Sequence, residues 1–369
     1  MKEDLILYYL NSFTSTEKDI LRNARAIPCT YIDNATDKEW DDITSAYKAL
    51  LPFGHLDSFK YEVAETGSYL IRGIFNRYID DDTFVVTSRH EHDTVRDCLS
   101  KVKHKLEIVY EDIIALDIDQ IYAAFKASGC TKFALYMVGT LIATGEIIPQ
   151  AFFEKLKAYL DEHNVQSLFI LDDVHGMFIT PRDYSLFDAV IYTCHSWICS
   201  FNMGMMFTRL PDQIGFRCKE NPAQYLDLIK LIISKFDKIR QFKQVLMEYF
   251  AEELADAKTF DVFKRTTPHI FSLVTYGLVF TQDQYDALYK YDIRLGETLS
   301  YRNFARIRCQ EFIIKDYDTV IKGLTLLKKT LRACKMVRDM SGIKPVFTDK
   351  KNITRKHLPD PHAALDVEL

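Results

Sequence analysis

The feature that most constrains the fold is an alternation of short apolar runs with amphipathic helical patterns, which begins near Tyr61. Four apolar runs have the length of buried strands, and they span 84–87, 133–138, 167–171 and 189–192. Between two of them, Phe153, Leu156 and Leu160 share one helical face after Pro149, a residue that suits a helix start. Strands that alternate with helices predict a mainly parallel sheet covered on both faces.

The chain of 369 residues has room for a large domain and a smaller one. We therefore expect an α/β fold, with a mainly parallel sheet flanked by helices in a large domain over 61–235. A smaller C-terminal α+β domain is expected over 236–336, with strands at 270–274 and 305–308, a helix around 285–291 and a last helix at 317–331. An N-terminal segment, 1–60, precedes them. The tail, 337–369, has little apolar periodicity and is expected to be loose.

Composition excludes several partners. Lys and Arg number 47 against 52 Asp and Glu, with no basic block, so a nucleic-acid partner is not expected. No apolar stretch approaches the roughly 20 residues of a membrane helix, and the first residues lack the pattern of a secretion signal. The eight cysteines are scattered through a large chain rather than spaced as a disulfide scaffold. A cytoplasmic protein with no membrane partner is expected.

Polar motifs follow the predicted strands or open the predicted helices, where open α/β sheets bind their ligands. The first is E-T-G-S-Y at 65–69, a glycine turn before a helix, whose free N–H groups suit a phosphate. The second, 87–95, carries Glu91 and His92 after a strand. The third is L-D-D-V-H-G at 171–176, with Asp172 and His175 directly after a strand. The fourth, 188–197, runs from Asp188 through a strand to T-C-H-S-W.

In this order the motifs resemble the aminotransferase class V branch of the fold type I pyridoxal-phosphate (PLP) enzymes, over about 61–331. The resemblance implies a cofactor site for PLP or its amine form, PMP. The implied phosphate-binding residues are Gly67, Ser68, Tyr69, Thr193 and His195, and Gly204 matches a glycine further downstream.

The remaining implied roles concern the ring and the substrate. The resemblance implies that His92 stacks on the pyridine ring and that Asp172, rather than Asp173, pairs with its nitrogen. His175 would bond the ring's 3-oxygen. Arg306, on a late strand, would bind a substrate α-carboxylate bidentately.

One residue departs from the pattern. In the family, the Schiff-base lysine follows the strand's aspartate by eight residues, and eight residues after Asp188 stands Ser196. No lysine occurs between Lys157 and Lys219, so a shift of register does not restore it. A serine hydroxyl cannot form an imine and is a poor base without activation, so tethered-cofactor chemistry is unavailable at this position.

Three interpretations follow. The first is an aminotransferase-like enzyme that holds PLP or PMP without a covalent bond and acts on an amino acid or an amino or keto substrate. His195 or His175 would then move protons, with Ser196 at the lysine position. The second is a catalytically inactive subunit or binding protein that partners another chain. The third is a deliberate replacement of the lysine. The resemblance also implies a homodimer, or a heterodimer with a lysine-bearing homologue.

Two other activities are disfavoured. A zinc site built from His175, Cys194, His195 and Cys199 is not expected, because adjacent strand residues point to opposite faces and the cysteine spacing is unsuited. We therefore predict no metal. The stretch 289–303 contains no cysteine, which argues against a cysteine desulfurase, whose family branch carries a reactive cysteine on a mobile loop.

Overall fold

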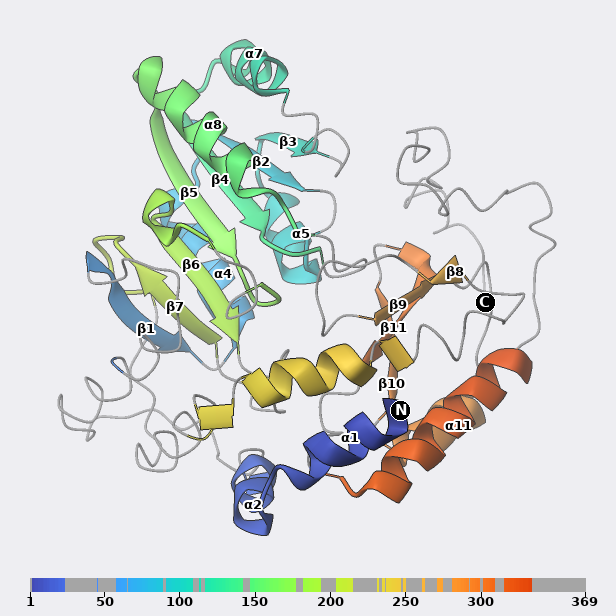
Figure 1. Ribbon diagram of the computed structural model, residues 1–369. Coiled ribbons are helices and arrows are strands. Elements are labelled where there is room, and N and C mark those ends of the chain that lie inside the picture. Colours follow the sequence, from blue (N-terminus) through green and yellow to red (C-terminus); the bar gives the residue numbers. More distant parts are fainter. Residues whose placement is uncertain are drawn as a thin grey trace. The chain divides into compact units, whose positions relative to one another are not determined.

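The computed structural model describes part of the chain, and the site is built from this part (Figure 1). The described residues are 2–23, 45, 58–64, 66–88, 91–108, 113, 117–141, 147–176, 182–193, 204–214, 231, 234–235, 237–246, 248–249, 261–262, 271–274, 281–291, 293–298, 301–308 and 315–333.

The chain divides into two compact units. The first, which carries the candidate site, comprises Ser15–Ile142 and Glu146–Phe236. The second comprises Met1–Thr14, Ala143–Gly145 and Asp237–Leu369. The four-segment division expected from the sequence stays a prediction.

A seven-stranded sheet forms the centre of the first unit, in the order β1-β7-β6-β5-β4-β2-β3. Its strands are β1 (Lys60–Ala64), β2 (Thr83–Ser88), β3 (His104–Ile108), β4 (Lys132–Val138), β5 (Gln166–Asp172), β6 (Ala189–Thr193) and β7 (Gly204–Thr208). Five neighbouring strands are parallel to one another: β3, β2, β4, β5 and β6. Strand β7 pairs antiparallel with both β6 and β1. The predicted α/β fold with a mainly parallel sheet is confirmed.

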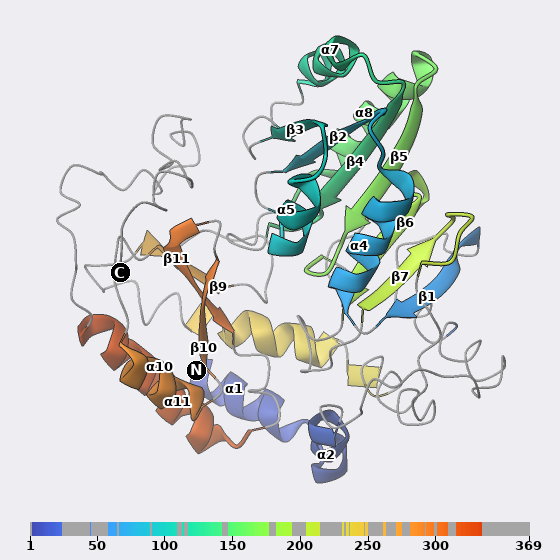
Figure 2. The ribbon, with the colours of Figure 1, turned by 180° about the vertical axis from the view of Figure 1, so that it is seen from behind.

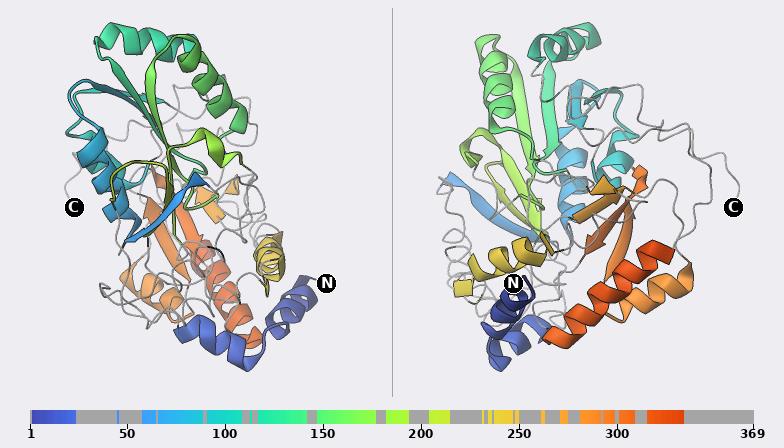
Figure 3. Two further views of the ribbon diagram at one scale, coloured as in Figure 1. Left: turned by 90° about the vertical axis from the view of Figure 1, so that its left-hand side faces the viewer. Right: turned by 45° about the vertical axis from the view of Figure 1, so that its right-hand side comes forward.

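Helices cover both faces of this sheet, as expected for parallel strands (Figures 1 and 2). On one face lie α4 (Gly67–Tyr78) and α5 (Asp93–Leu99), and on the other lie α7 (Ile118–Ser128) and α8 (Gln150–Glu162). The left view of Figure 3 shows α4 and α8 on opposite sides of the strands. Short helices α2 (Ser15–Asn23) and η3 (Tyr184–Leu186) complete the described helices of this unit.

Side chains alternate along each strand between these two layers. Val85, Tyr136 and Ile170 belong to the core that α4 and α5 cover, whereas Phe84 and Phe133 contact Phe125 of α7. The sheet interior is therefore filled on both faces, which explains why the strands read as continuous apolar runs.

The second unit contains a four-stranded antiparallel sheet in the order β10-β11-β9-β8. Its strands are β8 (Asp261–Val262), β9 (Phe271–Val274), β10 (Arg294–Thr298) and β11 (Tyr301–Arg308). Its helices in the described part of the chain include α1 (Lys2–Asn11), α10 (Gln282–Tyr289) and α11 (Tyr317–Ala333). A capping box, in which Thr281 and Gln284 exchange hydrogen bonds, starts α10.

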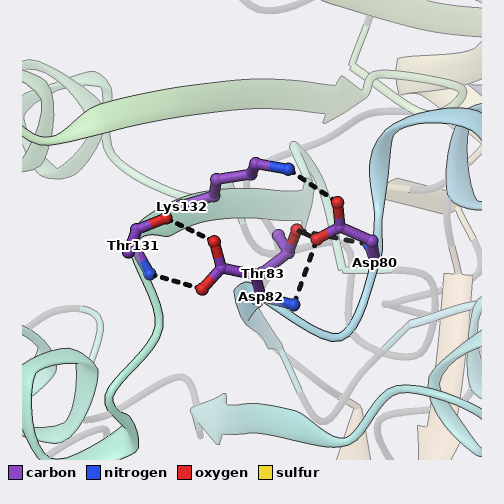
Figure 4. A network of polar contacts seen from close by, with 5 residues as sticks. All are labelled: Asp80, Asp82, Thr83, Thr131 and Lys132. Atoms are coloured by element: carbon purple, nitrogen blue, oxygen red, sulfur yellow. Dashed lines mark hydrogen bonds and ion pairs between the residues drawn. The ribbon is translucent and has the colours of Figure 1, made fainter.

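A polar network joins the starts of β2 and β4, at the sheet edge opposite the candidate site (Figure 4). Lys132 donates to Asp80 at 2.6 Å, and Thr83 donates to the same carboxylate at 2.7 Å. Asp82 accepts from the backbone N–H of Thr131 at 2.9 Å and from its hydroxyl. The turns before β2 and β4 are thus held in register, which aligns the ends of these strands.

Within the described part of the chain, no helix has both the length and the apolar character needed to cross a membrane.

Candidate cofactor site

The two neighbouring acids after β5 face opposite sides of the sheet. Asp172 lies on the side of Ile170, toward α4 and α5, while Asp173 lies on the side of α8. Both carboxyl groups are buried, with exposed fractions of 4% and 0%. Alternation along the strand therefore gives the two acids different neighbours and different tasks.

Asp172 ends β5 with its carboxylate partly satisfied. Oδ2 accepts a hydrogen bond from the Tyr136 hydroxyl at 3.0 Å, and Oδ1 accepts one from the Val174 N–H at 3.2 Å. Burial raises the pKa of Asp172, while these two donors act to lower it. A carboxylate has about four lone-pair positions, so Asp172 keeps the capacity to accept a further hydrogen bond.

Asp173 is held by structural partners instead. It accepts a hydrogen bond from the Tyr184 hydroxyl at 2.7 Å and lies 3.6 Å from the Arg182 Nε in a fully buried ion pair. Arg182 also donates to the Gly139 carbonyl at 2.5 Å and lies over the Phe153 ring. Removal of Asp173 would leave a buried guanidinium unpaired, so this acid serves the fold.

The helix start at Gly67 lies close to the end of β6 and the start of β7. Thr66 caps α4 by accepting a hydrogen bond from the Tyr69 N–H at 3.2 Å. A Cβ built on Gly204 would lie 2.3 Å from the Thr66 carbonyl carbon and 2.4 Å from the Gly67 nitrogen, so only glycine fits there. A Cβ on Gly67 would lie 3.3 Å from the Thr193 Cγ2. The structure thus brings Gly67, Thr193 and Gly204 together.

This arrangement leaves the first N–H groups of a twelve-residue helix without intrahelical partners beside a threonine. The helix dipole adds partial positive charge at the same end. The close approach of Gly204 to the Thr66–Gly67 peptide fixes this helix start against β7, and the free N–H groups of the helix start suit a phosphate group.

His92 precedes α5 and is exposed, with its ring orientation fixed by the backbone. Its Nδ1 accepts a hydrogen bond from the Thr94 N–H at 3.2 Å, and the Thr94 hydroxyl lies 2.8 Å from the Ser68 hydroxyl. This bond connects the start of α5 to the first turn of α4. His92 thus precedes one of the two helices that cover the face of the sheet on which Asp172 lies.

His175 and Tyr69 complete the described set. His175 is buried in the turn that follows β5, three residues after Asp172. Tyr69 is exposed in the first turn of α4. The predicted site residues Gly67, Ser68, Tyr69, His92, Asp172, His175 and Thr193 all lie where parallel strands end or where α4 and α5 start.

Glu91 was not among the predicted site residues, and the structure draws attention to it. Its side chain is 2% exposed, and Oε1 accepts hydrogen bonds from the Ser88 hydroxyl and the Val138 N–H, both at 2.9 Å. Burial, reinforced by the charge of Asp172, raises its pKa to about 8. The sequence signal was its place next to His92, because a glutamate after a buried strand is unusual unless it is paired.

Three predicted residues are not part of this description. His195 and Ser196 lie outside the described residues. Arg306 lies on β11 in the second unit, opposite Gly296 and Ser272 in register. The roles predicted for these three residues stay predictions.

Among the described residues, no group of three or more His, Cys, Asp or Glu side chains could hold a metal ion. Of the four zinc ligands considered from the sequence, Cys194, His195 and Cys199 lie outside that part.

Neither a protein-family profile nor a curated protein matches this sequence. Solved structures do match it. A NifS-like protein from Rickettsia africae superposes with a TM-score of 0.60 at 10% identity, over 87% of this chain and 98% of that one. The serine palmitoyltransferase of Sphingomonas wittichii gives a TM-score of 0.58 at 14% identity, over 90% and 86%.

The fold is that of the fold type I PLP enzymes. A third match, the TDC of Oryza sativa with PLP and tryptamine, gives a TM-score of 0.59 at 11% identity, over 80% of this chain and 76% of that one. At such low identities the similarity concerns the fold, and the argument for a site must come from the residues of this chain.

Proposed function

We propose that this chain binds PLP or PMP without a covalent bond and acts, in the manner of an aminotransferase, on an amino acid or an amino or keto substrate. The observation that carries the proposal is that the two neighbouring acids at the end of β5 have different partners. Asp173 is occupied by Arg182 and Tyr184, while Asp172 faces α4 and α5 with capacity to accept another hydrogen bond.

The phosphate and the ring of the cofactor each have candidate partners among the described residues. The first N–H groups of α4, from Gly67 and Ser68, would hold the phosphate, with the Thr193 hydroxyl beside them. His92 would stack on the ring, and Asp172 would accept a hydrogen bond from the protonated ring nitrogen. When bound, PLP supplies an electron sink for bonds broken at a substrate's α-carbon.

The chain's own residues would then bind, orient and move protons. Asp172 would hold a proton at the ring nitrogen, and His175 would form a hydrogen bond with the ring's 3-oxygen. Arg306 would bind the substrate carboxylate through its planar guanidinium. His195 or His175 would move the substrate proton that a lysine moves elsewhere in this fold, with Ser196 at the lysine position.

The absence of a lysine between Lys157 and Lys219 also favours a second function. In this alternative, the chain is a catalytically inactive subunit or binding protein, which partners a lysine-bearing homologue as a heterodimer. The first alternative implies a homodimer. Both alternatives use a fold type I unit, and they differ in whether the pocket binds cofactor and turns over substrate.

The test of the proposed function compares the two acids. Asp172→Ala should weaken PMP binding by about a hundredfold or more, because a buried partner of a charged nitrogen costs about 3–5 kcal/mol to remove. Asp173→Ala should change the affinity of the folded protein little. Isothermal titration of both variants and the wild type with PMP measures the difference.

Equal, small effects in both variants would contradict the assignment of Asp172. Circular dichroism of each variant serves as the control for folding, because Asp173→Ala also leaves Arg182 unpaired.

A further inference from the structure

Glu91 is the buried ionisable group next to the site to which the proposed function gives no task. It stands between two elements that must be aligned for a flat ligand to bind. One is the start of α5, which His92 precedes, and the other is the end of β4, where Val138 pairs with Asp172 of β5.

The contacts of Glu91 cross this gap. Its Oε1 accepts from the Ser88 hydroxyl, at the end of its own strand, and from the Val138 N–H, 47 positions further along the chain. Val138 lies opposite Asp172 in the parallel register of β4 and β5. The next N–H, that of Gly139, donates to the Asp172 carbonyl at 2.7 Å. A single carboxyl oxygen of Glu91, the residue before His92, thus binds the end of β4. This strand end pairs with Asp172 of β5.

We propose that Glu91 is a positioning residue, whose carboxyl holds the segment that carries His92 at a fixed distance from Asp172. This role rests on the proposed function, since the two residues held in place are those expected to contact the ring. The geometry is independent of it, because the hydrogen bonds exist in the chain without a ligand.

The protonation state supports the same role. Burial and the charge of Asp172 keep the Glu91 carboxyl protonated at neutral pH, with its pKa at about 8. Burial is also the main cause that raises the pKa of the Tyr136 hydroxyl, which donates to Asp172, well above its usual range. A neutral amide can replace the protonated carboxyl with the same acceptor oxygen.

This equivalence defines the experiment. Glu91→Gln keeps an oxygen for Ser88 and Val138, whereas Glu91→Ala removes both hydrogen bonds. Asp188→Asn serves as the matched control. Asp188 also accepts a hydrogen bond from a backbone N–H, that of Phe169 at 2.8 Å, but it directly precedes β6, at the amino end of the parallel strands and away from the candidate site. Two quantities are measured for each full-length protein: amide hydrogen exchange without ligand, and the dissociation constant for PMP.

In Glu91→Ala we expect faster exchange at Val138 and over 91–95, with exchange in α8 unchanged, and PMP binding weakened by about tenfold or more. In Glu91→Gln we expect exchange and affinity within about threefold of the wild type, and the same for Asp188→Asn. Rescue by glutamine separates a positioning role from a general loss of stability.

If Glu91→Ala binds PMP as tightly as the wild type, the positioning role is overturned while the proposed function stands. If glutamine fails to restore affinity although exchange is restored, the role is likewise overturned. A wild-type chain that binds no PMP overturns the proposed function and this role with it.

Discussion

Replacement of Glu91 by glutamine should change how the stability of the protein depends on pH. In the folded chain the Glu91 pKa is about 8, against an ordinary value of 4.5 in the unfolded chain. An acid whose folded pKa is raised stabilises the fold below its unfolded pKa, and this contribution is lost as the pH rises from 4.5 to 8. Glutamine has no such titration.

The magnitude follows from the size of the shift. Each pKa unit corresponds to about 1.4 kcal/mol, so the wild type should lose about 3 kcal/mol by pH 7, about 4 kcal/mol by pH 8 and about 5 kcal/mol above pH 9. Relaxation around a buried charge reduces these values, which are upper figures. The difference in unfolding free energy, Glu91→Gln minus wild type, should therefore rise with pH and become level above about pH 9. The pH-independent cost of a buried amide shifts the whole curve but not its slope.

Urea denaturation, followed by circular dichroism, measures this difference for the ligand-free proteins. The experiment is repeated in steps of about one pH unit from about pH 5 to about pH 9, across the titration range. Glu107→Gln is the matched control, because Glu107 is exposed on neighbouring β3 and its replacement should give a small difference at every pH. A difference for Glu91→Gln that stays flat from acid to alkaline pH would refute the reasoning, since it would mean that the carboxyl ionises in the fold as it does in the unfolded chain.

Three further predictions concern other parts of the site. Gly204→Ala should lower stability by about 1–3 kcal/mol and weaken PMP binding, because its Cβ would overlap the Thr66–Gly67 peptide; a thermal melt and a PMP titration that match the wild type would contradict the close contact. Asp173→Ala should lower the unfolding free energy by about 3–5 kcal/mol, because Arg182 is then buried without its partner, and an unchanged urea midpoint would argue against the buried pair. Ser196→Lys should create a lysine that reacts with bound PLP, since burial favours its neutral form; borohydride reduction should then add one cofactor mass to the chain, and an unchanged mass would count against the assignment of this position.

The sheet and its helices could be predicted from the sequence to a large extent. Four predicted strands correspond to β2, β4, β5 and β6, each extended by one or two residues, and the helix predicted after Pro149 is α8. These elements are buried on both faces, so their apolar runs are continuous. The expected strand at 305–308 is the end of β11, which begins at Tyr301.

Other strands were missed for a physical reason. β3 reads H-K-L-E-I and lies at the sheet edge, where polar residues face solvent on alternate positions. β1 also lies at an edge, and β7 follows a stretch with no strong pattern. Edge strands have weaker apolar signals, because fewer of their side chains enter the core.

The candidate site was predictable in part. The order of motifs indicated Asp172 and His92, and in the structure His92 precedes α5, which covers the face of the sheet on which Asp172 lies. The burial of Asp173 with Arg182, and the contact of Glu91 with Val138, depend on pairings between distant segments. No local pattern encodes such pairings, so the place of Glu91 next to His92 did not reveal the partners that bury it.

The most direct test of the central claim is the mass of the protein after PLP binding and reduction. PLP is added at no more than the protein concentration, so that surface lysines react little, and a visible spectrum follows saturation before borohydride is added. We predict saturable binding, lost in Asp172→Ala, and a protein whose intact mass is unchanged by reduction. Absence of saturable binding, or one reduced cofactor attached to each wild-type chain, would contradict a pocket that holds PLP without a lysine.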